Sequence, residues 1–473
     1  MKVAFHTLGC KVNQYESEAM AQMFRERGWD IGDEREFADV YVINTCTVTA
    51  TADKKSRQYI RRMKRVNPDS IIAVTGCFSQ ISPDEVSKIK GVDIVTGTNE
   101  KHTLIDYVEE LLASRADAGE PFTVIHPYDE LGVFEEMGIV ASIESRTRAY
   151  IKVQEGCSRF CSYCVIPYAR GPVRSRALED IVAEAKALIE AGYKELVLTG
   201  INTAMYDMEG RDLYAAGASV SGEDAAPDEP FGIEKAIAAI NELPGEFRIR
   251  LSSLEPAVVN ADYVKRLFKY DKLCHHLHMS AQSGSDRILK AMNRPYDRAA
   301  YLEMAKTLYD FDPCYGLSTD IIVGFPGEKE SDFDESYGLV AECCFCRTHV
   351  FKYSKRPGTK AAEMKDQVSP QVKDRRSDEL QDAAAKAAKI FFEVNIGHAN
   401  EGRTEEVLFE EIVTAQADGA GISKGDRLLT GYTGNYIRVY VPAGDDAETR
   451  LNAFAKIRLE TIFCDGIAAS VVQ

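Results

Sequence analysis

The strongest guide to the fold is the stretch Cys157-Ser158-Arg159-Phe160-Cys161-Ser162-Tyr163-Cys164. Three thiols separated by three and then two residues can bind one metal cluster, but a [4Fe–4S] cluster normally takes four cysteine ligands. The spacing therefore predicts a cluster with one iron left open for another ligand. A structural zinc site is the alternative, but zinc usually takes paired cysteines or two cysteines and two histidines, and no fourth ligand follows this stretch.

Composition limits the classes of protein. A chain of 473 residues with 45% hydrophobic residues has room for about three domains. No run of 18 apolar residues and no signal sequence occurs, so we expect a cytoplasmic protein without a membrane partner. Its twelve cysteines therefore suit metal ligands or core positions better than disulfides. The net charge of −17 argues against diffuse nucleic-acid binding, so any RNA contact must be local.

Residues 1–115 alternate apolar strands with helical patterns, which predicts a small parallel sheet covered by helices. Strands are expected at Val3–Leu8, Val40–Asn44, Ile71–Thr75 and Val92–Val95. Cys10, Cys46 and Cys77 each lie just past one of the first three strands. Because the carboxyl ends of parallel strands share one edge of a sheet, we expect these thiols to converge into a second metal site. Burial as ordinary small core residues is the alternative for each one taken singly.

Residues 116–146 are predicted to be a linker, and residues 147–376 repeat a strand–helix pattern typical of a partial (β/α)6 barrel. Polar or glycine-bearing turns follow the predicted strands. On a barrel these turns lie at the carboxyl ends of the strands, where active sites form. They carry Asn202, Ser252, Ser253, Gln282, Ser283 and Gly324. Ala215–Glu229 is acidic and lacks a core pattern, so it is expected to be an exposed insertion.

Residues 395–473 change to short alternating strands with glycine turns, which predicts a small all-β barrel. The fold class is therefore α/β: a parallel α/β domain, a central partial barrel and a small all-β barrel. Period-two counting places Tyr436 and Arg438 together on one strand face. Aromatic and basic side chains suit base stacking and phosphate contact, although such a face also occurs on any small barrel.

A helix starting near Asp53 carries seven cations with no acidic residue between them. A charged helix face is usually only solvated, but this run stands out on an acidic protein and follows Cys46 closely. It predicts a phosphate-binding patch. The seven cations are Lys54, Lys55, Arg57, Arg61, Arg62, Lys64 and Arg65.

Assembled, these motifs resemble the methylthiotransferase family of the radical S-adenosylmethionine (SAM) superfamily. The likeness covers nearly the whole chain and includes Tyr150–Cys157, Pro167–Gly171 and Ser318–Glu328. The signature Gly9-Cys10-Lys11-Val12-Asn13 resembles the branch that acts on N6-threonylcarbamoyladenosine at position 37 of tRNA. The isopentenyladenosine branch usually has Gly-Cys-Gln-Met-Asn there, and the branch acting on ribosomal protein S12 has Gly-Cys-Pro-Lys-Asn.

The resemblance implies a transferase with two [4Fe–4S] clusters and SAM as cofactors, and with a C-terminal TRAM domain of the OB-like kind. The catalytic cysteines would be Cys157, Cys161 and Cys164, which serve SAM cleavage, and Cys10, Cys46 and Cys77, which serve sulfur transfer. The six turn residues named above would form the SAM walls. The implied partners are the tRNA anticodon loop with adenosine 37, an electron donor and a sulfur source. tRNA contacts are expected at Tyr168, Arg170, Arg61, Arg62, Arg65, Tyr436 and Arg438.

Two kinds of alternative stay open at this point. Within the enzyme class, the substrate would be isopentenyladenosine 37 of tRNA or ribosomal protein S12. Outside it, the chain would be an iron–sulfur protein that binds RNA without chemistry. Such a scaffold predicts sites with four cysteines and no SAM pocket, and both cysteine triplets count against it.

Overall fold

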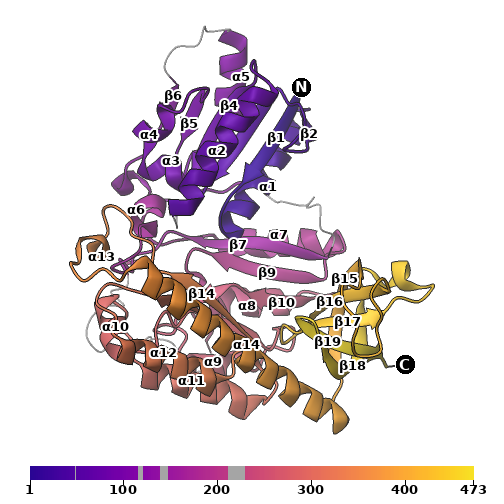
Figure 1. Cartoon of the computed structure of the whole chain (residues 1–473). Coiled ribbons are helices and arrows are strands. Elements are labelled where there is room, and N and C mark those ends of the chain that lie inside the picture. Colours follow the sequence, from indigo (N-terminus) through magenta and orange to yellow (C-terminus); the bar gives the residue numbers. More distant parts are fainter. Residues whose placement is uncertain (48–49, 115–120, 139–146, 211–228, 473) are drawn as a thin grey trace.

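The structure is a computed structural model that describes residues 1–47, 50–114, 121–138, 147–210 and 229–472. It has three parts in chain order (Figure 1): a helix-covered sheet, a partial barrel beneath it and a small β-barrel beside the second part. The predicted insertion Ala215–Glu229 lies outside the described residues, except for its last residue. Within the described part of the chain, no helix is both long and apolar enough to cross a bilayer.

The N-terminal part is a six-stranded sheet in the order β2-β1-β3-β4-β5-β6, and every neighbouring pair of strands is parallel. Strands β3 and β4 are buried along their whole length, because helices cover both faces of the sheet. The strands are β1 (Lys2–Thr7), β2 (Asp30–Gly32), β3 (Val40–Thr45), β4 (Ile71–Gly76), β5 (Ile94–Thr96) and β6 (Phe122–Val124). The helices are α1 (Lys11–Glu26), α2 (Ala50–Val66), α3 (Cys77–Ile81), α4 (Pro83–Ser87) and α5 (Leu104–Ser114).

The predicted parallel sheet is confirmed, but the linker prediction for residues 116–146 is wrong in part. Strand β6 lies inside that range and pairs with β5 at the edge of the sheet. Leu131, in the same range, is fully buried. Three-residue strands such as β2 and β6 are too short to show a hydrophobic period, so sequence reasoning missed both.

The central part contains six parallel strands of a partial barrel, β7, β9, β10, β12, β13 and β14, as predicted. Their bounds, with those of the short strands β8 and β11, are β7 (Arg148–Glu155), β8 (Arg174–Ser175), β9 (Glu195–Gly200), β10 (Arg248–Leu251), β11 (Ser253–Leu254), β12 (His276–Met279), β13 (Gly316–Val323) and β14 (Arg347–Lys352). The helices are α6 (Ile166–Arg170), α7 (Leu178–Glu190), α8 (Ile233–Asn241), α9 (Ala261–Leu267), α10 (Asp286–Ala291), α11 (Arg298–Phe311), α12 (Glu330–Cys343), α13 (Lys360–Glu363) and α14 (Pro370–Asn400).

Helix α14 leads into the C-terminal part, so the predicted domain end at residue 376 falls inside a helix. A closed five-stranded barrel follows, which confirms the predicted all-β fold. Its strands are β15 (Glu405–Thr414), β16 (Arg427–Thr433), β17 (Arg438–Pro442), β18 (Phe454–Phe463) and β19 (Gly466–Val471). Arg250 of β10 fixes this barrel in place by donating hydrogen bonds to the carbonyls of Thr433 and Gly434.

Candidate active site

Cys157, Cys161 and Cys164 lie in the loop that leaves the carboxyl end of β7. The loop turns sharply at Gly156, which has φ +73° and whose added Cβ would lie 1.7 Å from the carbonyl oxygen of Pro172. All three thiols are free of disulfides. Burial and the neighbouring Cys161 raise the pKa of Cys157 to about 12, which places these two thiols close together. The loop thus gathers its three thiols as the sequence predicted.

A buried arginine contacts this first triad. Arg294 Nη1 lies 3.3 Å from Cys161 Sγ and 3.3 Å from Glu255 Oε1. Glu255 in turn accepts hydrogen bonds from Arg159 Nε at 2.6 Å and from Asn202 Nδ2 at 2.8 Å. Sequence reasoning placed Asn202 near this loop but missed Arg294, which follows α10 and carries no motif of its own.

Cys10, Cys46 and Cys77 converge at the carboxyl ends of β1, β3 and β4. Gly9, with φ +117°, makes the approach possible: a Cβ there would lie 2.9 Å from Cys46 Cβ and 3.1 Å from Cys46 Sγ. Cys10 is exposed and lies close enough to Cys77 to raise its pKa, after the larger effect of burial. The second triad is therefore present as the strand positions predicted.

Arg170 links the second triad to the barrel, and it is fully buried. Its Nε lies 3.2 Å from Cys77 Sγ, and its Nη2 donates to Asn13 Oδ1 at 2.5 Å. It also pairs with Glu16 of α1 and with Glu155, which ends β7. The structure thus places Arg170 where tRNA does not reach it, so the prediction that it contacts tRNA is wrong.

The pairs around Arg170 belong to a buried charge network between the two domains. Lys152 contacts Glu16 at 3.2 Å and Glu155 at 2.9 Å, and Lys101 contacts Glu16 at 3.4 Å. The side chains of these four residues have no exposed surface. Cations in this network, Arg170 foremost, lower the pKa of Glu16 to about 2 against the opposing effect of burial. The network holds α1 and α6 against β7, as Figure 1 shows for the three elements.

Both triads fit an iron–sulfur cluster. Each offers three cysteine sulfurs, one fewer than the usual four, and each has one arginine within hydrogen-bond distance of a sulfur. Thiols bind metal as thiolates, so binding of iron would displace their protons. Hydrogen bonds to the sulfurs are a known means of setting the potential of a cluster.

A cavity of about 250 Å³ lies beside Cys164. It is lined by Gln282, which was predicted to contact SAM, and by Asp320 and Phe351 on β13 and β14. Gln282 has φ +66° and donates its backbone N–H to the carbonyl of Asp320 at 2.8 Å, which holds its turn across the end of the barrel. The cavity thus joins the cluster loop to the carboxyl-end loops where SAM was expected.

The other residues predicted to contact SAM have partners in the protein. Ser252 and Thr203 share a hydrogen bond of 2.7 Å, and buried Ser283 lies 3.2 Å from the hydroxyl of Ser336. Their contacts connect loops at the ends of neighbouring strands. Gly324 donates its N–H to Glu328 at 2.6 Å, and Ser253 is exposed on β11.

Comparison with known proteins gives the chain its family. Residues 2–97 match the model described as "Uncharacterized protein family UPF0004", and residues 151–340 match the radical SAM superfamily. The "Threonylcarbamoyladenosine tRNA methylthiotransferase MtaB" of Bacillus subtilis (strain 168) is 40% identical over 94% of this chain and 91% of its own length. The chain belongs to the radical SAM methylthiotransferase family.

Other members of the methylthiotransferase family are also similar. The "tRNA-2-methylthio-N(6)-dimethylallyladenosine synthase" of Clostridium botulinum (strain Hall) is 36% identical over 91% of this chain and 90% of its own length. Among solved structures, the radical SAM methyltransferase TsrM from Kitasatospora setae shares the fold. It has a TM-score of 0.52 at 14% identity, and the match covers 76% of this chain and 77% of that one.

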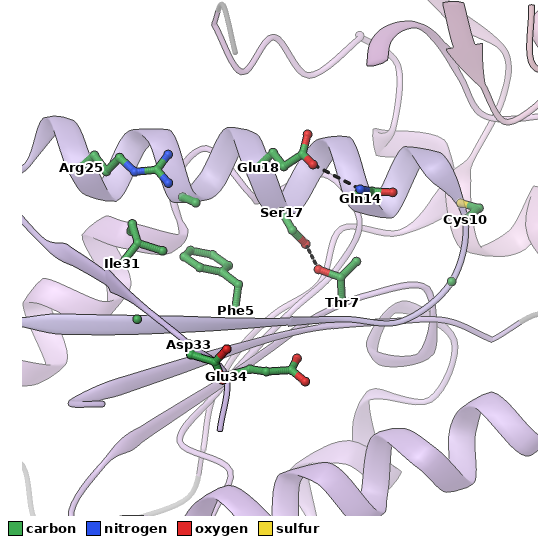
Figure 2. A pocket seen from close by; sticks show the side chains of 13 residues that line it. Phe5, Thr7, Cys10, Gln14, Ser17, Glu18, Arg25, Ile31, Asp33 and Glu34 are labelled. Carbon is green, nitrogen blue, oxygen red and sulfur yellow. Dashed lines mark hydrogen bonds between the residues drawn. The ribbon is translucent and has the colours of Figure 1, made fainter. Parts of the chain in front are cut away.

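A groove of about 620 Å³ leads to Cys10 on the N-terminal domain of this methylthiotransferase. Figure 2 shows Cys10 at one end of α1, with Thr7 and Phe5 facing the helix from β1 and with Asp33 and Glu34 below. Thr7 donates to Ser17 at 2.7 Å across the groove. The groove makes the second triad accessible to small molecules from solvent.

Tyr168 lies at the surface just beyond the first triad of the methylthiotransferase. Its side chain is 49% exposed, and its ring packs edge-on against Phe160 at 5.6 Å between centroids. Tyr128 packs on the other side of Phe160 at 6.4 Å. Exposed aromatic rings beside a cluster loop suit stacking on unpaired bases. The structure therefore leaves Tyr168 available for the predicted contact with tRNA.

The predicted basic patch lies on α2, beside the loop that carries Cys46. Arg57 pairs with Glu85, and Lys64 pairs with Asp93 at 3.2 Å, so these two charges are balanced. The remaining cations are exposed and have no carboxylate partner among the described residues. They are Lys54, Lys55, Arg61, Arg62 and Arg65.

Tyr436 and Arg438 of the C-terminal barrel both have partners inside the protein. The Tyr436 ring stacks on His276 at 4.5 Å and on Tyr432 at 5.0 Å between centroids, at the junction with the partial barrel. Arg438 pairs with Glu411 at 3.2 Å and with Asp465 at 3.5 Å. Tyr436 precedes β17 and has φ +70°, so the prediction that it shares a strand face with Arg438 is wrong, and both predicted tRNA contacts would compete with these interactions.

Proposed function

We propose that the chain installs a methylthio group at C2 of N6-threonylcarbamoyladenosine 37 in tRNA. The observation that carries the proposal is the pair of three-cysteine sites on two facing domains, joined by buried Arg170. The similarity to MtaB of Bacillus subtilis supports this choice of substrate. One triad suits SAM cleavage and the other suits holding a sulfur, which are the two tasks that methylthiolation requires.

At the first triad, Cys157, Cys161 and Cys164 would hold a [4Fe–4S] cluster with one iron open to SAM. The chemistry supplied there is one-electron reductive cleavage of SAM, which allows removal of an unactivated hydrogen such as the one on adenine C2. Arg294 keeps Cys161 in place, and Gln282 closes one side of the cavity. Asn202, which follows β9, donates a hydrogen bond to Glu255, which follows β11, and this contact joins the two loops.

At the second triad, Cys10, Cys46 and Cys77 would hold a second [4Fe–4S] cluster whose open iron takes the sulfur to be methylated. Arg170 orients Cys77 and ties the triad to β7 through Glu155. The exposure of Cys10 and the groove beside it give a sulfur source a way in. An electron donor is needed as well, since SAM cleavage consumes an electron.

The domains have corresponding tasks in this proposal. The N-terminal part through β6 is the methylthiotransferase domain, the part from β7 through α14 is the radical SAM barrel, and the closed barrel that begins at β15 is the TRAM domain. The chain acts in the cytoplasm, where its substrate tRNA is found. The patch on α2 and exposed Tyr168 lie on the first two domains next to the triads. They are the surfaces best suited to the anticodon loop.

Neutralising the patch tests how tRNA is held. We expect Arg61→Gln, Arg62→Gln and Arg65→Gln together to weaken tRNA binding about tenfold or more at low salt. Loss of up to three phosphate contacts should also make the log–log salt dependence shallower by up to about three. Fluorescence anisotropy across a salt titration measures both quantities. As a control, the same charge change is made at three exposed lysines of the barrel helices, Lys186, Lys306 and Lys386. An unchanged salt slope in the arginine variant would remove the patch from the tRNA site.

Nucleoside analysis tests the function itself. Reconstituted, reduced protein with SAM, a sulfide source and tRNA containing N6-threonylcarbamoyladenosine should yield the 2-methylthio derivative, detected by mass spectrometry. The relative from Clostridium botulinum makes isopentenyladenosine 37 the second candidate, so tRNA carrying that nucleoside is assayed in parallel. If only that tRNA were methylthiolated, isopentenyladenosine 37 would replace N6-threonylcarbamoyladenosine 37 as the proposed substrate. Release of no 5′-deoxyadenosine from SAM would favour a non-catalytic RNA-binding scaffold.

A further inference from the structure

Lys11 has no ion-pair partner among the described residues and lies where the N-terminal domain meets the partial barrel. It is the first residue of α1 and directly follows Cys10 of the second triad. Its side chain is exposed, and its Nζ lies 6.0 Å from the ring centroid of Tyr150 on β7. Among the described residues no carboxylate lies within ion-pair distance of Lys11. The ammonium group therefore faces the barrel with its charge uncompensated.

Further cations surround Lys11 on the barrel side. Arg148 of β7 and Arg250 of β10 lie close enough to Lys11 to act on its charge. The nearest acidic group on that side, Glu195, is already paired with Arg148 at 2.6 Å and with Arg250 at 3.0 Å. Arg148 also pairs with Glu410 at 2.5 Å, so both carboxylates are engaged by arginines and the charge of Lys11 is left for an anionic ligand.

Strand β14 connects the surroundings of Lys11 with the cavity beside the first triad. His349 of β14 feels the charge of Lys11, and its ring lies 5.8 Å from that of His278. His278 Nε2 contacts Asp320 at 3.0 Å, and Asp320 lines the cavity next to Cys164. Phe351, 48% exposed, follows His349 along the same face of β14 and lines the same cavity. His349 and Phe351 therefore link the surroundings of Lys11 to the cavity beside the first triad.

We propose that Lys11 binds the carboxylate of the threonylcarbamoyl group and so selects this nucleoside over one with an apolar N6 substituent. The inference rests on the proposed function. The threonyl carboxylate is ionised at neutral pH, whereas a dimethylallyl group has no charge and no acceptor. C2 and C6 belong to the same six-membered ring and N6 is the substituent on C6, so the carboxylate lies within a side chain's reach of the atom that is modified. Lys11 is adjacent to the triad proposed to deliver sulfur to that atom.

The position also separates the branches of the family by sequence. The signature Gly9-Cys10-Lys11 has lysine where the isopentenyladenosine branch usually has glutamine. Glutamine retains length and hydrogen bonding but lacks the charge that a carboxylate requires. Lys11→Gln is therefore the substitution that tests charge alone.

The test measures binding of one tRNA in two forms, with N6-threonylcarbamoyladenosine or with unmodified adenosine at position 37, to the cluster-loaded protein. The natural protein should prefer the modified form about tenfold or more, as expected for one charge-assisted contact. Lys11→Gln should remove that preference without changing the affinity for unmodified tRNA. Lys11→Arg should retain it, and Lys386→Gln, which makes the same charge change at an exposed position on α14, should leave it intact.

Three outcomes would overturn the role of Lys11: a preference that survives in Lys11→Gln, no preference in the natural protein, or an equal loss of affinity for both tRNAs. The last result would assign Lys11 to backbone phosphates. Iron content of each variant verifies that the clusters are retained beside the altered residue. Failure of this inference is distinct from failure of the proposed function, because the natural protein would still form the methylthio product.

Discussion

Arg170→Met is expected to lower the free energy of unfolding of the cluster-free protein by about 3–5 kcal/mol. Arg170 is fully buried and pairs with Glu16 and Glu155, so methionine leaves two buried carboxylates with fewer cations. Removing one partner of a buried ion pair costs this much because the remaining charge keeps its desolvation penalty. Denaturant unfolding under anaerobic conditions, followed at the transition that reports on the N-terminal domain, measures the change.

Two comparisons keep this prediction specific. Arg170→Lys retains the charge but loses the forked geometry of the guanidinium group. Its free energy of unfolding should therefore fall by less than that of Arg170→Met. Arg427→Met removes an exposed pair with Glu448 and should cost less than about 1 kcal/mol. A loss of less than 1 kcal/mol for Arg170→Met would show that the network does not join the domains.

The effect of Arg170→Met should also depend on pH. The pKa of Glu16 in the folded protein is lowered to about 2, whereas the unfolded chain has the ordinary value near 4.5. A lowered carboxyl pKa contributes stability above the unfolded value, and that contribution is lost as the pH falls toward 2. The difference in free energy of unfolding between the natural protein and Arg170→Met should therefore have its full size at pH 7 and should shrink progressively below about pH 4.5.

The sequence allowed the cysteine sites to be predicted because their geometry follows from simple rules. Cys157, Cys161 and Cys164 are local in sequence, and Cys10 and Cys46 follow parallel strands whose ends share one edge. The contacts of the arginines with the sulfurs could not be found in this way: Arg170 was expected to contact tRNA, and Arg294 was missed. Arg170 and Glu16 lie 154 positions apart, and no local pattern distinguishes a buried arginine from an exposed one.

The same limit explains the errors elsewhere. The alternation of β17 placed Arg438 on the outer face correctly, but not its pairing with Glu411 and Asp465, which depends on neighbouring strands. On α2, no acidic residue lies between Lys54 and Arg65, and Asp53 precedes this run in the first turn of the helix. The acids that balance two of its cations come from distant segments. Tertiary pairing of charges is therefore the part of the site that sequence reasoning missed.

Replacing Cys157, Cys161 and Cys164 by alanine together is expected to abolish release of 5′-deoxyadenosine from SAM and formation of the methylthio product. The reason is that the first triad provides every protein ligand of the cluster that would reduce SAM. The second triad belongs to another domain and is held by Arg170, so it should survive the substitution. Cys10→Ala, Cys46→Ala and Cys77→Ala together form the matched control: they should abolish methylthiolation while leaving SAM cleavage in place.

The central claim is that two separate clusters occupy the two triads, and iron and sulfide content tests it most directly. Anaerobically reconstituted natural protein should contain about eight irons, and the Cys157, Cys161 and Cys164 triple alanine variant should retain about four, by the four-iron count of each cluster. A variant that retains no iron would contradict the account, because Cys10, Cys46 and Cys77 would then hold no cluster of their own.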